Sequence, residues 1–270
     1  MSTILHIENV TKKFGGLTAV DNLSIEVKKN SVHALIGPNG AGKTTVTNLI
    51  FGTLKVSGGK ILYKGEEINQ LPTYKIARKG IGRTYQNIKL FSSMTAAENV
   101  MVGGHSESKV GLLQSLYNPF AASKEEKMLR EKAEETLNIL GMYDLRDELV
   151  KNLPYGRQKV LELGRALMSE PELILLDEPA AGLNPSERLE LVSTMDKLYK
   201  QGKTLFLIEH NMDVVMTVSH DITVLNFGAK IAEGTPREVQ NNQDVITAYL
   251  GDRYKKQKKH FEEVDGNAGN

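Results

Sequence analysis

Eight consecutive residues near the start of the chain have the types and the spacing needed to hold a phosphate group. They match the pattern G-x-x-x-x-G-K-[ST] and are Gly37, Pro38, Asn39, Gly40, Ala41, Gly42, Lys43 and Thr44. Glycines in this pattern let backbone N–H groups turn toward phosphate oxygens, and the helix that follows adds its N-terminal dipole. We expect Lys43 to reach the β- and γ-phosphates and the Thr44 hydroxyl to bind Mg²⁺, with Thr45 beside it. The sequence thus predicts a nucleoside triphosphate site.

Two adjacent acids later in the chain could act on that triphosphate. Asp177 and Glu178 follow the apolar run Leu173–Leu176, which is typical of a buried strand. Acids at the carboxyl end of a buried parallel strand lie where α/β sheets bind ligands. We expect Asp177 to hold Mg²⁺ through water and Glu178 to polarise the attacking water as a general base.

These residues need a sheet to position them, and the sequence predicts one. Strand and helix patterns alternate, which indicates a mostly parallel sheet with helices on both faces. The expected strands are Val32–Ile36, Leu173–Asp177, Thr204–Ile208 and Ile222–Asn226. The expected helices run from about Gly42 to Phe51, from Pro185 to Lys200 and from Asn211 to Val218. The phosphate motif falls between a strand and a helix, as its mechanism requires.

The expected fold is an α/β P-loop NTPase core with a mostly parallel sheet, an N-terminal antiparallel β subdomain and an inserted α-helical subdomain. We expect one domain over residues 1–252, with its core in 1–87 and 161–252 and the helical subdomain in 88–160. A charged helix is expected there over Lys124–Leu140, capped by Ser123 and ended by Gly141. Residues 253–270 form a basic and then acidic tail, which we expect to be disordered.

The composition limits the classes of function. With 34 Lys and Arg against 33 Asp and Glu in 270 residues, the formal net charge is +1, so no strong field indicates nucleic acid as a partner. The chain contains no Cys, which excludes disulfides and thiolate chemistry. No signal peptide is recognised, and the longest apolar runs are strand-sized, whereas a membrane span needs about 20 apolar residues. Any role at a membrane would therefore need a partner chain.

Further motifs, in order along the chain, resemble those of the ATP-binding cassette family. The resembling positions are Phe14, Gln86, Leu153–Gln158, Ala181–Asn184 and His210. The resemblance implies that the nucleotide is ATP and that Phe14 stacks on its adenine. It also implies that Gln86 senses the γ-phosphate, Mg²⁺ and a membrane partner, and that His210 contacts the γ-phosphate.

The segment Leu153–Gln158 resembles the family's signature motif, which binds the ATP held by a second subunit. We expect Gly156 to reach that nucleotide, whereas Tyr155 either packs or senses it. The family commonly has Ser where this chain has Pro154, which has neither a hydroxyl nor an N–H group. We expect the following helix, Arg157–Met168, to supply backbone N–H groups at its N-terminus instead.

Several longer segments together resemble the larger ATP-binding subunit of branched-chain amino acid importers. They are Phe14–Val20, Gly82–Ile88, Ala180–Pro185, Ile208–Met212 and Val245–Gly251. This resemblance implies transmembrane permease subunits as partners, a solute-binding protein as an indirect one, and a place on the cytoplasmic face of the cell membrane. It favours a paralogous second ATPase over a second copy of this chain. The ATPase of lipopolysaccharide export is the nearest alternative, because it has a similar ending.

Two other classes of function remain as alternatives. A soluble cassette ATPase of translation or DNA repair usually has two cassettes or a long coiled coil, and this chain has one cassette and no heptad run. An unrelated P-loop GTPase would need an Asn-Lys-x-Asp motif, which is absent from the sequence, and a small-molecule kinase would not need the signature segment beside His210.

Overall fold

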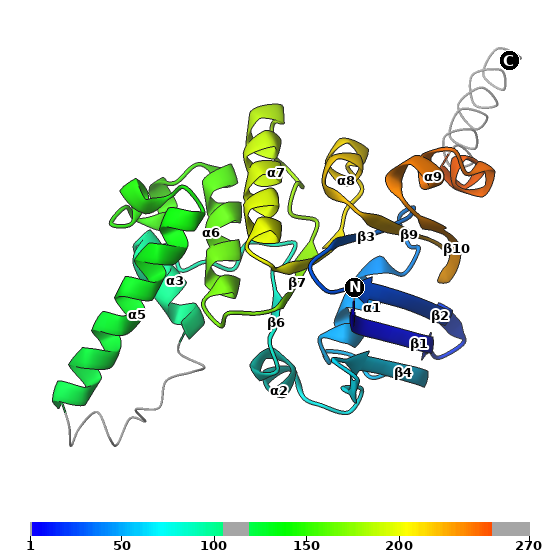
Figure 1. Ribbon diagram of the computed structural model, residues 1–270, viewed down its shortest axis with the longest axis horizontal. Helices are drawn as coiled ribbons and strands as arrows, with labels where there is room; N and C mark the ends of the chain where they lie inside the picture. Colours follow the sequence, from blue (N-terminus) through cyan, green and yellow to red (C-terminus); the bar gives the residue numbers. More distant parts are fainter. Residues whose placement is uncertain (1, 105–118, 250–270) are drawn as a thin grey trace, which may run out of the picture.

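A computed structural model describes residues 2–104 and 119–249 of the chain (Figure 1). Its main element is a six-stranded sheet with the strand order β10-β9-β3-β8-β7-β6. The strands are β3 (Val32–Ile36), β6 (Ile81–Arg83), β7 (Leu173–Asp177), β8 (Thr204–Ile208), β9 (Asp221–Asn226) and β10 (Ala229–Gly234). All neighbours in this sheet are parallel except β9 and β10. The predicted mostly parallel sheet is confirmed. The tail 253–270 lies outside the described residues.

The N-terminal part of the chain forms a second, antiparallel sheet with the order β2-β1-β4-β5. Its strands are β1 (Thr3–Phe14), β2 (Leu17–Lys28), β4 (Gly58–Tyr63) and β5 (Glu66–Glu67). The two long strands form a hairpin whose turn, Gly15-Gly16, places Phe14 opposite Leu17. The predicted α/β fold with an antiparallel N-terminal part is confirmed.

Helices cover the large sheet and extend away from it at one end (Figure 1). The α-helices are α1 (Lys43–Ile50), α2 (Thr73–Arg78), α3 (Ala96–Gly104), α5 (Pro119–Ile139), α6 (Tyr155–Leu167), α7 (Pro185–Lys200), α8 (Met212–Val218) and α9 (Pro236–Gln240). Two short 3₁₀ helices are η2 (Tyr143–Leu145) and η3 (Val150–Asn152). The sequence did not predict α2 or α9.

The two ends of α5, the long helix of the inserted part, differ in how well the sequence predicted them. Gly141 has φ 67°, the Met142 N–H donates to the Leu137 carbonyl (2.8 Å) and the Gly141 N–H donates to the Asn138 carbonyl (3.0 Å). This is the hydrogen-bond pattern of a glycine-ended helix, so the predicted end is confirmed. The predicted start is wrong: the helix begins at Pro119, so Ser123 lies inside it. Proline is favoured in a first helical turn, because the N–H that it lacks has no partner there.

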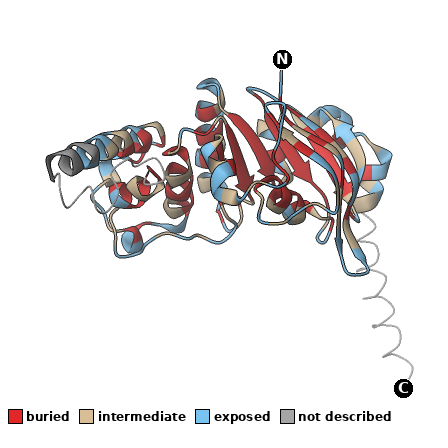
Figure 2. Ribbon diagram, turned by 90° about the horizontal axis from the view of Figure 1, so that it is seen from below, coloured by how far each residue is buried: buried red, intermediate tan, exposed pale blue. Residues whose placement is uncertain are grey.

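The central strands β3, β7 and β8 of the large sheet are buried along their whole length (Figure 2). Their side chains alternate between two cores. In β7, Leu173 and Leu175 pack toward the small sheet and α1, whereas Ile174 and Leu176 pack toward α7 and the inserted helices. In β8, Phe206 and Ile208 face the first core and Leu205 and Leu207 the second. Burial on both faces explains why these strands are continuous apolar runs rather than alternating ones.

The inserted helices pack tightly against one another and against the sheet. One core includes Val100 of α3, Leu137 of α5 and Leu163 of α6 as well as β7 and β8. Helix α6 continues past residue 160, the predicted end of the helical subdomain, without a break. At Gly103 the backbones of α3 and α6 nearly touch: a Cβ atom there would lie 2.0 Å from the Arg165 carbonyl oxygen.

This contact predicts that Gly103→Ala destabilises the fold. The methyl group would clash with backbone, which cannot rotate away, so the two helices must separate. We expect the free energy of unfolding to fall by about 1–3 kcal/mol in urea melts, despite the roughly 1 kcal/mol by which Ala otherwise favours a helix. Gly58→Ala is the matched control, because a Cβ atom there meets nothing within 4 Å. Equal stability of the two variants would contradict the predicted close packing.

Candidate active site

The phosphate motif forms the turn between β3 and α1. A Cβ atom on Gly37 (φ 153°) would lie 2.2 Å from the Leu225 carbonyl oxygen, and one on Gly42 (φ 102°) would lie 2.5 Å from that of Ala19. Both positions therefore accept only glycine. Helix α1 begins at Lys43, and the N–H groups of its first turn have no partner within the helix. The turn and the helix start thus offer N–H groups to an anion.

Lys43 bends back over this turn. Its ammonium donates to the carbonyl oxygens of Gly37 (2.8 Å) and Pro38 (3.0 Å). Burial lowers the pKa of Lys43, and the nearby carboxylates of Glu178 and Asp177 oppose that effect. The predicted phosphate-binding lysine therefore lies close enough to both predicted acids to interact with their charges.

Strand pairing brings the acids to the phosphate turn. In the parallel register Asp177 lies opposite Ile208 of β8, and Ile208 lies opposite Leu35 of β3. The three strands therefore end level with one another, and the residues that follow them gather at one edge of the sheet, the edge formed by the carboxyl ends of the strands. This edge is where open α/β sheets bind ligands.

Asp177 is buried and ion-paired. Its carboxylate accepts from Nη2 of Arg83 at 3.1 Å, and both side chains are at most 6% exposed. The Arg83 Nη1 donates to the Asn48 side chain (2.9 Å). Burial raises the pKa of Asp177, and the hydrogen bond and charge of Arg83 oppose this effect. No role was predicted for Arg83 from the sequence; it is the last residue of β6, as Asp177 is the last residue of β7.

Glu178 contacts two of the other predicted site residues. Its backbone is left-handed (φ 48°), and its N–H donates to the Ile208 carbonyl (2.9 Å). Its carboxylate accepts from the Gln86 amide at 2.7 Å and lies 3.7 Å from Nδ1 of His210. A left-handed backbone at a residue other than glycine costs about 1–2 kcal/mol per residue. Strain of this kind is typical of functional sites.

The Glu209 carboxylate fixes the backbone at the ends of β7 and β8. No role was predicted for this residue from the sequence. Its side chain is fully buried and accepts three backbone N–H groups: Ala180 (2.7 Å), His210 (3.0 Å) and Asn211 (3.0 Å). It therefore fixes both the turn after β7 and the start of the loop that carries His210. Its only signal in the sequence is a charged residue directly after an apolar strand.

The phosphate turn borders a hollow of about 350 Å³. Its lining consists of Leu17, Thr18, Ala19, Asn39, Gly40, Ala41, Gly42, Lys43, Thr44, Thr45, Glu178 and Phe227. Phe14 is 45% exposed and does not line the hollow, although it shares a face of its hairpin with Leu17, which does. Phe227 was not predicted; it is left-handed (φ 46°) and 84% exposed.

The signature residues lie elsewhere on the chain. Helix α6 begins at Tyr155, two residues earlier than predicted, so Gly156 is in its first turn. A Cβ atom on Gly182 would lie 3.0 Å from the Tyr155 ring, which places this ring against the turn Ala181–Asn184. Neither Tyr155 nor Gly156 lines the hollow.

The residues predicted to hold Mg²⁺ have suitable chemistry. Thr44, Gln86 and Asp177 offer hydroxyl, amide and carboxylate oxygens, the hard donors that this ion prefers. Among the described residues, no three His, Cys, Asp or Glu side chains are grouped as a metal site. Magnesium in phosphate sites uses one or two carboxylates together with phosphate and water, so this donor set fits it.

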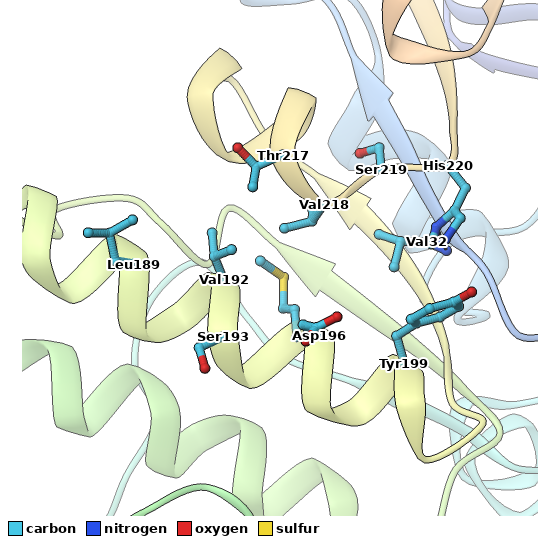
Figure 3. A pocket seen from close by; sticks show the side chains of 11 residues that line it. Val32, Leu189, Val192, Ser193, Asp196, Tyr199, Thr217, Val218, Ser219 and His220 are labelled. Atoms are coloured by element: carbon cyan, nitrogen blue, oxygen red, sulfur yellow. Dashed lines mark hydrogen bonds between the residues drawn. The ribbon is translucent and has the colours of Figure 1, made fainter.

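A larger hollow, of about 510 Å³, lies between α7 and the end of α8 (Figure 3). It is lined by Tyr199 and His220, whose rings are 4.6 Å apart, and by Val32 at the start of β3. The start of β3 is at the opposite edge of the sheet from the phosphate turn. Volume alone therefore does not identify the nucleotide site.

Comparison with known proteins agrees with this geometry. Residues 20–181 match the sequence model of the ABC transporter family, and residues 229–255 match that of the branched-chain amino acid ATP-binding cassette transporter. The chain is 43% identical to the high-affinity branched-chain amino acid transport ATP-binding protein BraF of Pseudomonas aeruginosa, over 92% of this chain and 98% of that protein. It is 41% identical to LivG of Escherichia coli over the same shares.

Solved structures give the same result. The ADP conformation of an ATP-binding cassette of an ABC transporter superposes with a TM-score of 0.82 at 34% identity, over 93% of this chain and all of that one. A nucleotide-free cassette superposes with a TM-score of 0.81 over 92% of this chain.

The chain belongs to the ATP-binding cassette family of ABC transporters, and it is an ATP-hydrolysing cassette. Within that family, the relatives named above are ATP-binding proteins of branched-chain amino acid transport. No helix among the described residues is long and apolar enough to cross a membrane.

The three hydrogen bonds of Glu209 lead to a stability prediction. Glu209→Ala leaves the three N–H groups without their acceptor, which should cost about 2–3 kcal/mol of unfolding free energy. Glu209→Gln keeps one carbonyl oxygen as acceptor, so its loss should be smaller. Urea melts measure both values. Wild-type stability of the Ala variant would contradict the organising role of this carboxylate.

Proposed function

We propose that this chain is the ATP-hydrolysing subunit that powers an importer of branched-chain amino acids. The observation that carries the proposal is its similarity to BraF, which extends over 92% of this chain and 98% of that protein. The match of residues 229–255 to the branched-chain cassette model supports it with a segment outside the phosphate site. The site at the sheet edge provides the ATPase, and the relatives indicate what it drives.

The phosphate turn holds the triphosphate of ATP in this proposal. The N–H groups of residues 37–45 bind phosphate oxygens, and Lys43 swings from its carbonyl partners to the β- and γ-phosphates. Phe14 stacks on the adenine. Thr44, Gln86 and Asp177 would hold Mg²⁺, which neutralises charge on the β- and γ-phosphate oxygens when bound.

Glu178 is the general base of this mechanism. Its carboxylate takes a proton from a water molecule as the water oxygen attacks the γ-phosphorus. The bond between that phosphorus and the bridging oxygen breaks, which leaves ADP and phosphate. Gln86 and His210, within 2.7 and 3.7 Å of the carboxylate, orient it and contact the γ-phosphate.

A second ATP-binding subunit completes each site. Gly156, Tyr155 and the start of α6 lie away from the hollow, so they serve the ATP of the partner subunit. The partner we favour is a paralogue, with a second copy of this chain as the alternative. Release of the γ-phosphate removes the ligand that joins the pair, and the pair reopens.

The transporter supplies the membrane part. We infer that transmembrane permease subunits hold this chain at the cytoplasmic face of the cell membrane, and that a solute-binding protein acts through them. The segment after Gln86, Lys89-Leu90-Phe91, and the helical subdomain 88–160 would contact the permease. Nucleic acid has no part in this proposal.

Two variants separate binding from hydrolysis. Lys43→Ala should weaken ATP binding about 10- to 100-fold, because it removes a charge-assisted contact to phosphate. Glu178→Gln should bind ATP normally but lower kcat about 10²- to 10⁴-fold, because the amide cannot accept the proton. Fluorescent-nucleotide titration and phosphate release measure the two quantities. Normal turnover of the Gln variant would refute the role of Glu178.

Uptake by intact cells tests the substrate. Replacing Lys43 with Ala in the native cell should reduce uptake of radiolabelled leucine, isoleucine and valine at low concentration to the level of a strain that lacks the chain. Lysine uptake is the control and should not change. Unchanged leucine uptake would leave the ATPase standing and contradict branched-chain amino acid import.

A further inference from the structure

The segment 84–91 crosses from the large sheet to the inserted helices, and we name it the crossing segment. On the sheet side, the Thr84 N–H donates to the Leu175 carbonyl (3.0 Å). Farther along, its backbone is bound by the helices. The Lys159 ammonium of α6 donates to the Gln86 carbonyl at 2.7 Å, and Arg165 of α6 donates to the Lys89 carbonyl.

Helix α3 binds the far end of the same segment. The Asn99 side chain, fully buried, accepts from the Phe91 N–H (2.8 Å) and donates to the Phe91 carbonyl (2.9 Å). From Gln86 onward, therefore, the backbone of the crossing segment is attached to α6 and α3.

The groups on α6 form a row of three charged side chains. Lys159, Glu162 and Arg165 are spaced three residues apart, which puts neighbours on one side of a helix. Lys159 is 6% exposed and Glu162 is 2% exposed, and Arg165 lies 3.8 Å from the Glu162 carboxylate. Burial of such charges is costly, and apolar residues of similar size would often be at least as stable. Stability alone therefore does not explain this row.

The electrostatics of the row connect it to the crossing segment. Burial raises the pKa of Glu162, and Arg165, Lys159 and the backbone amides of Lys89 and Tyr85 oppose that effect. Burial lowers the pKa of Lys159, and among the acids that oppose this effect Glu162 contributes most. The charge of Glu162 thus interacts with both of its neighbours on α6, of which Arg165 lies 3.8 Å from its carboxylate.

Gln86 points the other way with its side chain. Its amide donates to the Glu178 carboxylate at 2.7 Å, at the end of β7. One residue thus has its backbone attached to the inserted helices and its side chain attached to the proposed general base. A relative shift of about 1 Å would stretch this hydrogen bond beyond its useful range.

We propose that Lys159 is a positioning residue for ATP hydrolysis, which attaches the Gln86 backbone to α6 so that any shift of this helix moves the Gln86 amide onto or off Glu178, and that Glu162, one turn farther along α6, holds the Lys159 ammonium in place. The proposal rests on the roles proposed above for Gln86 and Glu178, and it adds the physical link between the helical part and the chemistry. A row that serves packing alone would affect stability and leave turnover unchanged.

The test measures the melting temperature of the full-length chain, and kcat and KM for ATP of this chain together with its second ATP-binding subunit. Lys159→Met removes the donor to Gln86 and should lower kcat about tenfold, the size of coupling found between neighbouring residues. KM should stay within about twofold, because Lys159 contacts no residue of the phosphate turn. Lys159→Arg keeps a donor and should restore most of kcat. Lys200→Met, on the surface of α7, is the matched control and should match wild type.

A double variant decides whether Lys159 acts through Gln86. In a Gln86→Ala background, Lys159→Met should cause no further loss of kcat, because the group that it positions is already gone. Glu162→Gln, which keeps the shape of the side chain, should lower kcat in the same direction and carries the same test if Lys159→Met does not fold. The proposal would be overturned if the kcat losses of Lys159→Met and Gln86→Ala multiply in the double variant. It would also be overturned if Lys159→Met lowers the melting temperature and leaves kcat normal.

The outcome also separates this proposal from the proposed function. If the wild-type chain hydrolyses ATP but the kcat losses of Lys159→Met and Gln86→Ala multiply in the double variant, only the positioning roles are refuted. Failure of leucine uptake to depend on Lys43 would refute only the transported substrate, because ATP hydrolysis by the chain does not require that solute.

Discussion

The parallel pairing of β3, β8 and β7 is the constraint on which the site depends. Because Leu35, Ile208 and Asp177 lie level in adjacent strands, every residue that follows these strands emerges at one edge of the sheet. Residues from positions 37, 178 and 210 thus become neighbours although they are far apart in the sequence. Two buried cores, one on each face, hold the strands in this register.

Gathering charges at that edge costs free energy, and the structure offsets it with specific partners. Arg83 pairs with Asp177, and three backbone N–H groups bind the buried Glu209 carboxylate. Glu178 keeps its strained backbone and faces Gln86. Tyr155 and Gly156, at the start of α6, do not reach the hollow. The single chain is therefore well organised for binding ATP and is completed by a second subunit in the proposed mechanism.

The sequence predicted the elements that carry the site better than those around it. The bounds of β3, β7, β8 and α7 agree with the predicted ones residue for residue, because each is a long apolar or periodic run between clear turn signals. Short helices such as α2 and α9 lack such periodicity, and the start of α5 was misplaced. Motif order singled out Gln86, Glu178 and His210, and the structure places Gln86 and His210 within 3.7 Å of the Glu178 carboxylate. The partners Arg83, Glu209 and Lys159 depend on long-range packing, which a single sequence does not encode in any local pattern.

The most direct test is an experimental structure of the Glu178→Gln variant with ATP and Mg²⁺. We expect the triphosphate in the hollow beside Gly37–Thr45, with the Lys43 ammonium moved onto the β- and γ-phosphates. We also expect Gly156 of a second ATP-binding subunit to lie against the γ-phosphate. Nucleotide bound in the hollow between α7 and α8 would contradict the proposed ATP site. Nucleotide bound at the phosphate turn with no second subunit near it, at any protein concentration, would contradict the proposed completion of the site by a partner.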